Sequence, residues 1–154
     1  MPRGAGLNSR RLDDVPINRE QAEITMTTKY IAELVSAYPA IREVWLYGSR
    51  ANGTAGVNSD WDYLAFANDQ TLAELHLDTR FHDARIDLMI VTDGTRFAKP
   101  WVDGDRQKVG TLAAEFGGLY WAEVSESEAT YRATKADPES GTLVFQQRAT
   151  RVFP

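Results

Sequence analysis

The stretch VWLYGSRANGTAGVNSDWDYLAF, residues 44–66, decides the fold, because it joins two apolar segments through a polar turn. The first segment, Ile41–Tyr47, contains β-branched and aromatic residues and ends at a glycine, which predicts a short strand. The second, Trp61–Ala67, is predicted to be a largely buried strand. Asp60 and Asp62 stand at the start of that second strand. Two acids at the start of a buried strand require a chemical explanation.

A carboxylate site is the explanation that these acids favour. Residues two apart in a strand point to the same face, so Asp60 and Asp62 are expected side by side, where their like charges repel. A third acid, Asp87, interrupts the strand predicted for Ala84–Val91. If the two strands are neighbours, three carboxylates converge, and oxygen ligands of this kind suit Mg²⁺. We therefore predict catalytic and metal-binding roles for Asp60, Asp62 and Asp87, with two Mg²⁺ ions clamping an in-line phosphoryl displacement and Asp87 receiving the acceptor's proton.

The turn after the first strand has the features of a phosphate-binding element. A glycine there permits close backbone approach, and amides at a following helical turn attract phosphate oxygens. Ser49 adds a hydroxyl and Arg50 adds a charge. The predicted nucleotide-binding residues are Gly48, Ser49, Arg50 and Ser59. A surface ion pair is an equal alternative for Arg50, and Asp87 is open to pairing with Arg85 or Arg50.

The rest of the chain predicts a mixture of helices and strands. Apolar residues recur at helical spacing from Thr28 to Tyr38, and one or two helical turns are expected within Thr71–Arg80. A further helix is expected from an Asp105 cap to Phe116. The alternating segments after it favour two or three antiparallel strands. The fold class predicted is α/β (α+β), with a mixed sheet flanked by helices and additional C-terminal antiparallel strands.

Size and composition favour one domain. The chain has 154 residues, 43% of them apolar, which suits a single core. Residues 1–25 are expected to form a flexible segment, with a nucleic-acid-binding arm as the alternative, and residues 26–154 a single domain. The net charge of −5 argues against a groove for long nucleic acids. Zero cysteines exclude thiolate metal sites, and the absence of a long apolar run or leader favours a cytoplasmic protein without a membrane partner.

The histidines and tryptophans are not predicted to take part in the chemistry of the site. His76 and His82 match no ligand spacing and are interpreted as surface or rim residues. Trp101, beside a proline in a predicted loop, is the tryptophan that fits the wall of a nucleotide pocket.

The order of these motifs resembles the DNA polymerase β-like nucleotidyltransferase superfamily. An apolar strand is followed by Gly48-Ser49, ten residues, Asp60-x-Asp62, and then a strand with a single Asp. The chain is most similar to the minimal nucleotidyltransferase domains, some of which are antitoxin partners of HEPN-type ribonuclease toxins. The matching segments are LYGSRANG (46–53), NSDWDYLAF (58–66) and RIDLMIV (85–91). Trp61 replaces a smaller aliphatic residue of the family, which implies different packing behind the site.

The resemblance implies that residues 26–154 form a single nucleotidyltransferase-like domain and that the protein is a magnesium-dependent enzyme. It would transfer a nucleoside monophosphate, AMP from ATP as the first expectation, to a hydroxyl acceptor and release pyrophosphate. The acceptor favoured is a partner protein, as in toxin–antitoxin pairs. One alternative is a small-molecule, antibiotic-modifying nucleotidyltransferase, whose acceptor pocket the C-terminal strands would form, alone or with a second copy of the chain. The other is a catalytically silent nucleotide-binding or partner-binding module.

Overall fold

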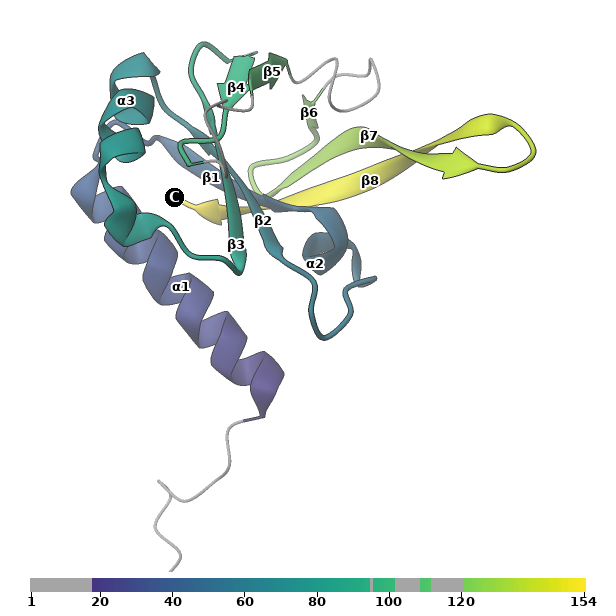
Figure 1. The fold of residues 1–154 in the computed structure, drawn as a ribbon, viewed down its shortest axis with the longest axis horizontal. Helices are drawn as coiled ribbons and strands as arrows, with labels where there is room; N and C mark the ends of the chain where they lie inside the picture. Colours follow the sequence, from purple (N-terminus) through teal and green to yellow (C-terminus); the bar gives the residue numbers. More distant parts are fainter. Residues whose placement is uncertain (1–17, 95, 102–108, 112–120) are drawn as a thin grey trace, which may run out of the picture.

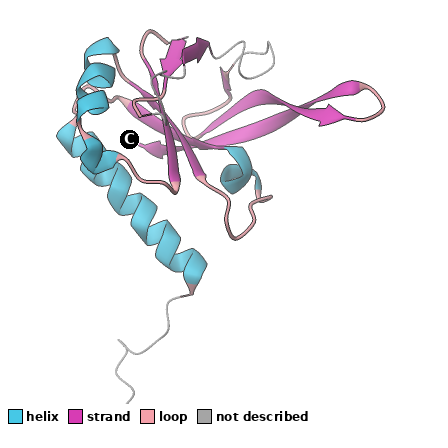
Figure 2. Cartoon of the chain, in the orientation of Figure 1, coloured by secondary structure: helices cyan, strands magenta, loops and turns pink. Residues whose placement is uncertain are grey.

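The computed structural model of this protein describes residues 18–94, 96–101, 109–111 and 121–154. The helices are α1 (Arg19–Ala37), α2 (Gly48–Asn52) and α3 (Asp69–Leu77), with a 3-10 turn, η2, at Thr79–Phe81. The strands are β1 (Glu43–Tyr47), β2 (Trp61–Phe66), β3 (Ile86–Val91), β4 (Arg96–Ala98), β5 (Val109–Thr111), β6 (Ala122–Glu123), β7 (Glu128–Asp137) and β8 (Gly141–Phe153). Figure 2 shows α1 and α3 together on one side of the strands. The predicted α+β class is confirmed.

Helix α1 is longer than the periodicity indicated. The side-chain oxygen of Asn18 caps it by accepting a hydrogen bond of 2.7 Å from the Gln21 amide. Residues 19–25, which the sequence placed in a flexible segment, form its first turns. Residues 1–17, and with them the alternative of a nucleic-acid-binding arm, lie outside the described residues. Neither α1 nor another helix in the described part of the chain is long and apolar enough to cross a membrane.

One sheet holds the described strands together. Its eight strands follow the order β5-β4-β3-β2-β1-β8-β7-β6. Strands β2 and β3 are parallel, and the other neighbouring pairs are antiparallel. A parallel pair needs a crossover connection, which α3 and η2 supply. In the register of this pair Asp62 lies opposite Asp87, so the mixed sheet brings the two acids together.

The two faces of the sheet carry different side chains, because neighbours in a strand point to opposite faces. Trp61 belongs to the buried cluster on the α1 side. Leu64 and Met89 belong to a second cluster, which includes residues of β7 and β8. Asp62 and Asp87 have the same parity as Leu64 and Met89. Their side chains therefore lie on the face away from α1.

Strands β7 and β8 form a long hairpin that projects beyond the rest of the sheet (Figure 1). Its register runs from Glu128 opposite Thr150 to Asp137 opposite Gly141. Gly141 closes the turn with a φ of 85°, a conformation that favours glycine. The far end of β8 pairs with β1, with Leu46 opposite Thr150. The predicted C-terminal antiparallel strands are confirmed, and they are joined directly to the central sheet.

The helix predicted between Asp105 and Phe116 is wrong over Val109–Thr111. These residues form strand β5, which pairs with β4 at the edge of the sheet. The flanking Val and Thr are β-branched, and the Gly between them is a poor helix former. Pairing with the edge of β4 therefore outweighs the helical spacing of the apolar residues in this segment. The rest of the predicted helix lies outside the described residues.

Candidate active site

The parallel pairing of β2 and β3 creates the centre of the site. Asp62, the second residue of β2, lies directly across from Asp87, the second residue of β3. Both side chains are partly buried. Asp60 lies immediately before β2 and is exposed. The three predicted acids are thus at one end of neighbouring strands, with Asp60 at the rim.

Burial and the neighbouring acids disfavour the ionised form of Asp62. The pKa of Asp62 is raised to about 7, first by burial, then by the Asp87 carboxylate and then by Asp60, while Lys99 lowers it. A group with a pKa near 7 is partly protonated at neutral pH. An added cation would favour the ionised form.

Lys99 already supplies one positive charge. Its Nζ lies 2.8 Å from each carboxylate oxygen of Asp87. Neither predicted arginine partner of Asp87 takes this place, because Arg85 pairs with Asp83 at 2.9 Å and Arg50 lies on the other face. Lys99 follows β4, whose neighbour in the sheet is β3. This residue was missed because only the strand order brings it to Asp87.

The carboxylate oxygens of the three acids suit a hard cation, although Lys99 already occupies the oxygens of Asp87. The acids offer oxygen ligands only, which is the chemistry that Mg²⁺ prefers. Among the described residues, however, no three His, Asp or Glu side chains are grouped so that they could hold one metal ion. The Asp87 oxygens face Lys99 instead. Lys99 would therefore have to leave Asp87 before the predicted site could hold an ion with all three acids.

Position 48 requires a glycine because the backbone there lies against the Asp62 carboxylate. A Cβ atom at Gly48 would lie 2.3 Å from Oδ2 of Asp62, and the φ of Gly48 is 73°. The close approach expected of this glycine is therefore made to the carboxylate. The Gly48 amide, expected to face phosphate, donates a hydrogen bond of 2.8 Å to the hydroxyl of Tyr131.

Ser49 follows Gly48 in the first turn of α2. The Ser49 carbonyl accepts hydrogen bonds from the amides of Gly53 and Thr54, which close the end of this five-residue helix. The amide and hydroxyl of Ser49 thus come one residue after the glycine that packs against Asp62.

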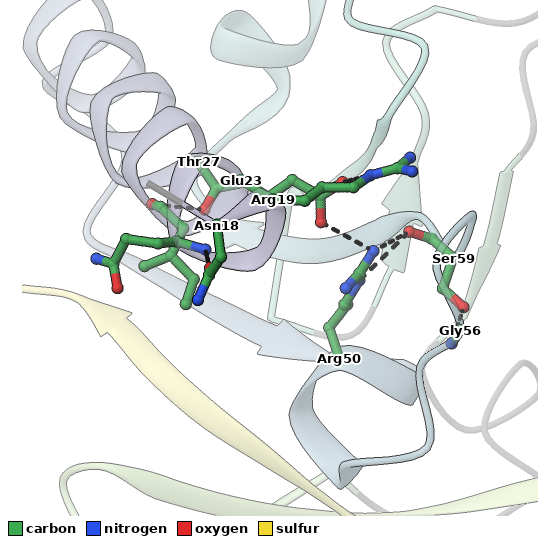
Figure 3. A network of polar contacts seen from close by, with 9 residues as sticks. Asn18, Arg19, Glu23, Thr27, Arg50, Gly56 and Ser59 are labelled. Atoms are coloured by element: carbon green, nitrogen blue, oxygen red, sulfur yellow. Dashed lines mark hydrogen bonds and ion pairs between the residues drawn. The ribbon is translucent and has the colours of Figure 1, made fainter. Parts of the chain in front are cut away.

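Arg50 and Ser59 organise the loop that follows α2, as Figure 3 shows. The Arg50 guanidinium donates to the Ser59 carbonyl at 2.9 and 3.3 Å and pairs with Glu23 of α1 at 3.2 Å. It also lies over the Trp61 ring, 4.8 Å from its centroid. The Ser59 hydroxyl accepts a hydrogen bond of 2.9 Å from the Gly56 amide. Arg50 therefore takes the ion-pair alternative in this structure and points away from the carboxylates.

A cavity of about 820 Å³ lies on this Arg50 side of the sheet. Its walls come from α1, the loop after α2, β2 and the end of β8, and none of the three acids lines it. Its charged residues include Arg50 and Glu23, which pair with each other. The cavity is thus separate from the carboxylate site, and strand β2 lies between them.

The other residues considered from the sequence lie apart from the carboxylates. His76 Nδ1 is 2.8 Å from the Pro100 carbonyl oxygen. His82 stacks on Trp101, with ring centroids 5.3 Å apart. Trp101 packs against the cluster on the α1 side, so it does not form a wall beside Asp62 and Asp87.

Comparison with known proteins agrees with the motifs. Residues 29–100 match the family model described as polymerase beta, nucleotidyltransferase. A solved structure of a Sulfolobus solfataricus protein, provisionally assigned as a nucleotidyltransferase, shares 23% identity. That similarity covers 46% of this chain and 68% of the other, with a TM-score of 0.39. The comparison with curated proteins gave no significant match.

Proposed function

Because residues 29–100 belong to the DNA polymerase β-like nucleotidyltransferase superfamily, we propose that this protein transfers AMP from ATP to a hydroxyl acceptor in a Mg²⁺-dependent reaction. One observation carries the proposal: Asp62 lies across from Asp87 in parallel strands, with Gly48 packed against Asp62. Burial and the neighbouring Asp87 carboxylate raise the pKa of Asp62, so this partly buried acid is a poor structural element and a suitable ligand for a cation.

The three acids share the metal-binding role, and Asp87 has a second role as the proton acceptor. Asp60 and Asp62, with Asp87, would hold the magnesium ions. When bound, Mg²⁺ supplies the positive charge that neutralises the phosphate oxygens during transfer. Asp87 accepts the proton of the attacking hydroxyl after Lys99 moves away. The acceptor oxygen forms a bond to the α-phosphorus as the bond from that phosphorus to the pyrophosphate oxygen breaks, and pyrophosphate leaves.

The phosphates are assigned to the start of α2. The amide and hydroxyl of Ser49 follow directly after Gly48, whose missing side chain allows this turn to pack against Asp62. Arg50 is not included, because its guanidinium is held by Ser59 and Glu23.

A partner protein is the acceptor that we favour. The β7–β8 hairpin projects from the sheet and exposes Leu143 and Val144 near its end, at 45% and 47% of their surface. Exposed apolar side chains on a projecting hairpin suit contact with a protein. A toxin–antitoxin pair is one arrangement that would present a protein hydroxyl in this way.

A catalytically silent module is the second candidate, and the Lys99–Asp87 ion pair favours it. Lys99 contacts both oxygens of Asp87, so that acid is compensated without any metal. In that case the protein would bind a nucleotide or a partner without transfer.

A labelling experiment distinguishes the candidates. The purified protein is incubated with each α-³²P-labelled NTP and Mg²⁺, with and without a lysate from its source, and the products are separated on a gel. We expect a labelled protein band with ATP that is lost in Asp62→Asn and kept in the matched control Asp69→Asn, whose residue lies on α3. Absence of label together with Mg²⁺-dependent ATP binding would support the silent module instead.

A further inference from the structure

The β7–β8 hairpin lies outside residues 29–100, the segment that matches the nucleotidyltransferase family. It is nevertheless hydrogen-bonded to α2, the short helix that begins at Gly48 in the candidate site. Two separate sets of hydrogen bonds make this attachment. Tyr131 of β7 holds the start of α2, and the backbone of β8 holds its end. No feature of the sequence linked these segments, since they are far apart along the chain.

The Tyr131 hydroxyl has a fixed position. It accepts the hydrogen bond of 2.8 Å from the Gly48 amide and donates one of 2.9 Å to Oε1 of Gln147. The Tyr131 ring packs edge-on against Tyr47 and stacks on Trp121, with both centroid distances at 6.0 Å. The residue is 3% exposed. Because the ring is enclosed, the hydroxyl has little freedom to leave the Gly48 amide.

Asn52 makes the second attachment. Its Nδ2 donates hydrogen bonds of 2.9 Å to the carbonyls of Gly48 and Arg148, and its Oδ1 accepts one of 2.9 Å from the Arg148 amide. The last residue of α2 is therefore paired with β8 much as a neighbouring strand would be. Both ends of the helix that contains Ser49 depend on the hairpin.

The protonation state of the Tyr131 hydroxyl fits its hydrogen bonds to Gly48 and Gln147. Burial raises its pKa, the hydrogen bonds with Gly48 and Asn52 lower it, and the charge of Asp62 raises it. Tyr131 therefore stays protonated at neutral pH and can donate to Gln147 while it accepts from Gly48.

We propose that Tyr131 is a positioning residue of the nucleotide site, and that the β7–β8 hairpin is part of this site and not an appendage to it. By holding the Gly48 amide, Tyr131 sets the direction of the Tyr47–Gly48 peptide, one residue before Ser49, and keeps Gly48 against Asp62. The inference rests on the proposed function, because it assumes that phosphates bind at Ser49. Without the Tyr131 hydroxyl, the Gly48 amide loses its partner and the turn loses its preset geometry.

The substitution Tyr131→Phe tests this proposal, because it removes only the hydroxyl oxygen that holds the Gly48 amide. In Tyr131→Phe we expect the dissociation constant of Mg·ATP, measured by isothermal titration calorimetry, to rise roughly tenfold. In the transfer assay we expect the KM for ATP to rise by the same factor with kcat changed less than about threefold. Exchange of the Gly48 amide, measured by NMR without nucleotide, should also become faster.

Tyr30→Phe is the matched control. The Tyr30 hydroxyl is also partly buried and donates a hydrogen bond of 2.7 Å to the Phe81 carbonyl, on the α1 side of the sheet. We expect Tyr30→Phe to lose stability without changing the Mg·ATP dissociation constant. Gln147→Leu removes the acceptor of the Tyr131 hydroxyl and should raise the dissociation constant several-fold, which keeps the test valid if Tyr131→Phe folds poorly.

The outcomes separate this inference from the proposed function. If the wild-type protein binds Mg·ATP and transfers AMP, and Tyr131→Phe and Gln147→Leu bind Mg·ATP equally well, the inference is overturned while the proposed function stands. If the wild-type protein binds no nucleotide, both are overturned. Faster Gly48 exchange without a change in nucleotide affinity would reduce Tyr131 to a structural role.

Discussion

Strand β2 has opposite chemistry on its two faces. On one face Asp62 lies beside Asp87, and the nearest cation is Lys99, which contacts only Asp87 in the described structure. On the other face Trp61 lies under Arg50, whose guanidinium has three kinds of partner at once: a carbonyl, a carboxylate and an aromatic ring. The first cation can move away with the loss of one ion pair, whereas the second is fixed. The difference indicates which face is built for exchange of ligands and which face holds the loop in place.

The largest effect is expected from Gly48→Ala. The added Cβ would meet Oδ2 of Asp62, at 2.3 Å, and the φ of 73° would be strained. We expect a loss of about 3 kcal/mol in the free energy of unfolding and no detectable nucleotide binding, measured by urea denaturation and calorimetry. Gly53→Ala is the control, since Gly53 has a φ of 70° but a Cβ added there would meet nothing within 4 Å. It should cost only about 1 kcal/mol; equal losses in the two variants would contradict the assigned contact with Asp62.

Asp62→Asn should reduce transfer about 10²- to 10³-fold while stabilising the fold. The pKa of Asp62 is raised from 3.8 to about 7, so the folded state binds its proton more tightly than the unfolded state. Stability from this group is complete below about pH 4 and is lost as the pH rises through 7. We expect the variant to be more stable than the wild type by about 1–2 kcal/mol above pH 7, since partial exposure of Asp62 allows solvent screening. Thermal unfolding between pH 4 and 8 checks this, and a gap that does not widen with pH would refute it.

Arg50→Lys tests the fixed face. A lysine keeps the charge but loses the forked hydrogen bonds to Ser59 and the planar contact with Trp61. We expect a loss of about 1–2 kcal/mol in the free energy of unfolding with Mg·ATP affinity unchanged. Weaker nucleotide binding at unchanged stability would restore Arg50 as a phosphate contact.

Lys99→Met tests the exchangeable cation and should have the smallest effect. Removal of the ammonium frees both oxygens of Asp87. We expect the affinity of the nucleotide-free protein for Mn²⁺, measured by electron paramagnetic resonance, to rise about fivefold. Lys29→Met is the control, because Lys29 is exposed and pairs only at 3.8 Å with Glu33 of its own helix. Equal Mn²⁺ affinity in the wild type and Lys99→Met would show that Lys99 does not compete with the ion.

Local pattern was sufficient for the central strands and for the residues at their ends. The alternation around Asp62, the glycine at the end of β1 and the lone acid in β3 are all short-range signals, because the period of a strand assigns each residue to a face. The same kind of signal failed at Val109–Thr111, where helical spacing was outweighed by pairing with β4. A strand edge that lies open to pairing cannot be read from the segment that fills it.

The partners of the candidate site depend on strand order, which no local pattern encodes. Lys99 reaches Asp87 because β4 lies beside β3, and Tyr131 reaches Gly48 because β8 pairs with β1 and brings β7 with it. Arg50 was left between two roles by its position in the chain, and the packing of α1 across the sheet brought Glu23 to it. The acids and the glycine follow from the chain's own periodicity, whereas the cation, the hydroxyl and the loop clamp around them follow from contacts between distant segments.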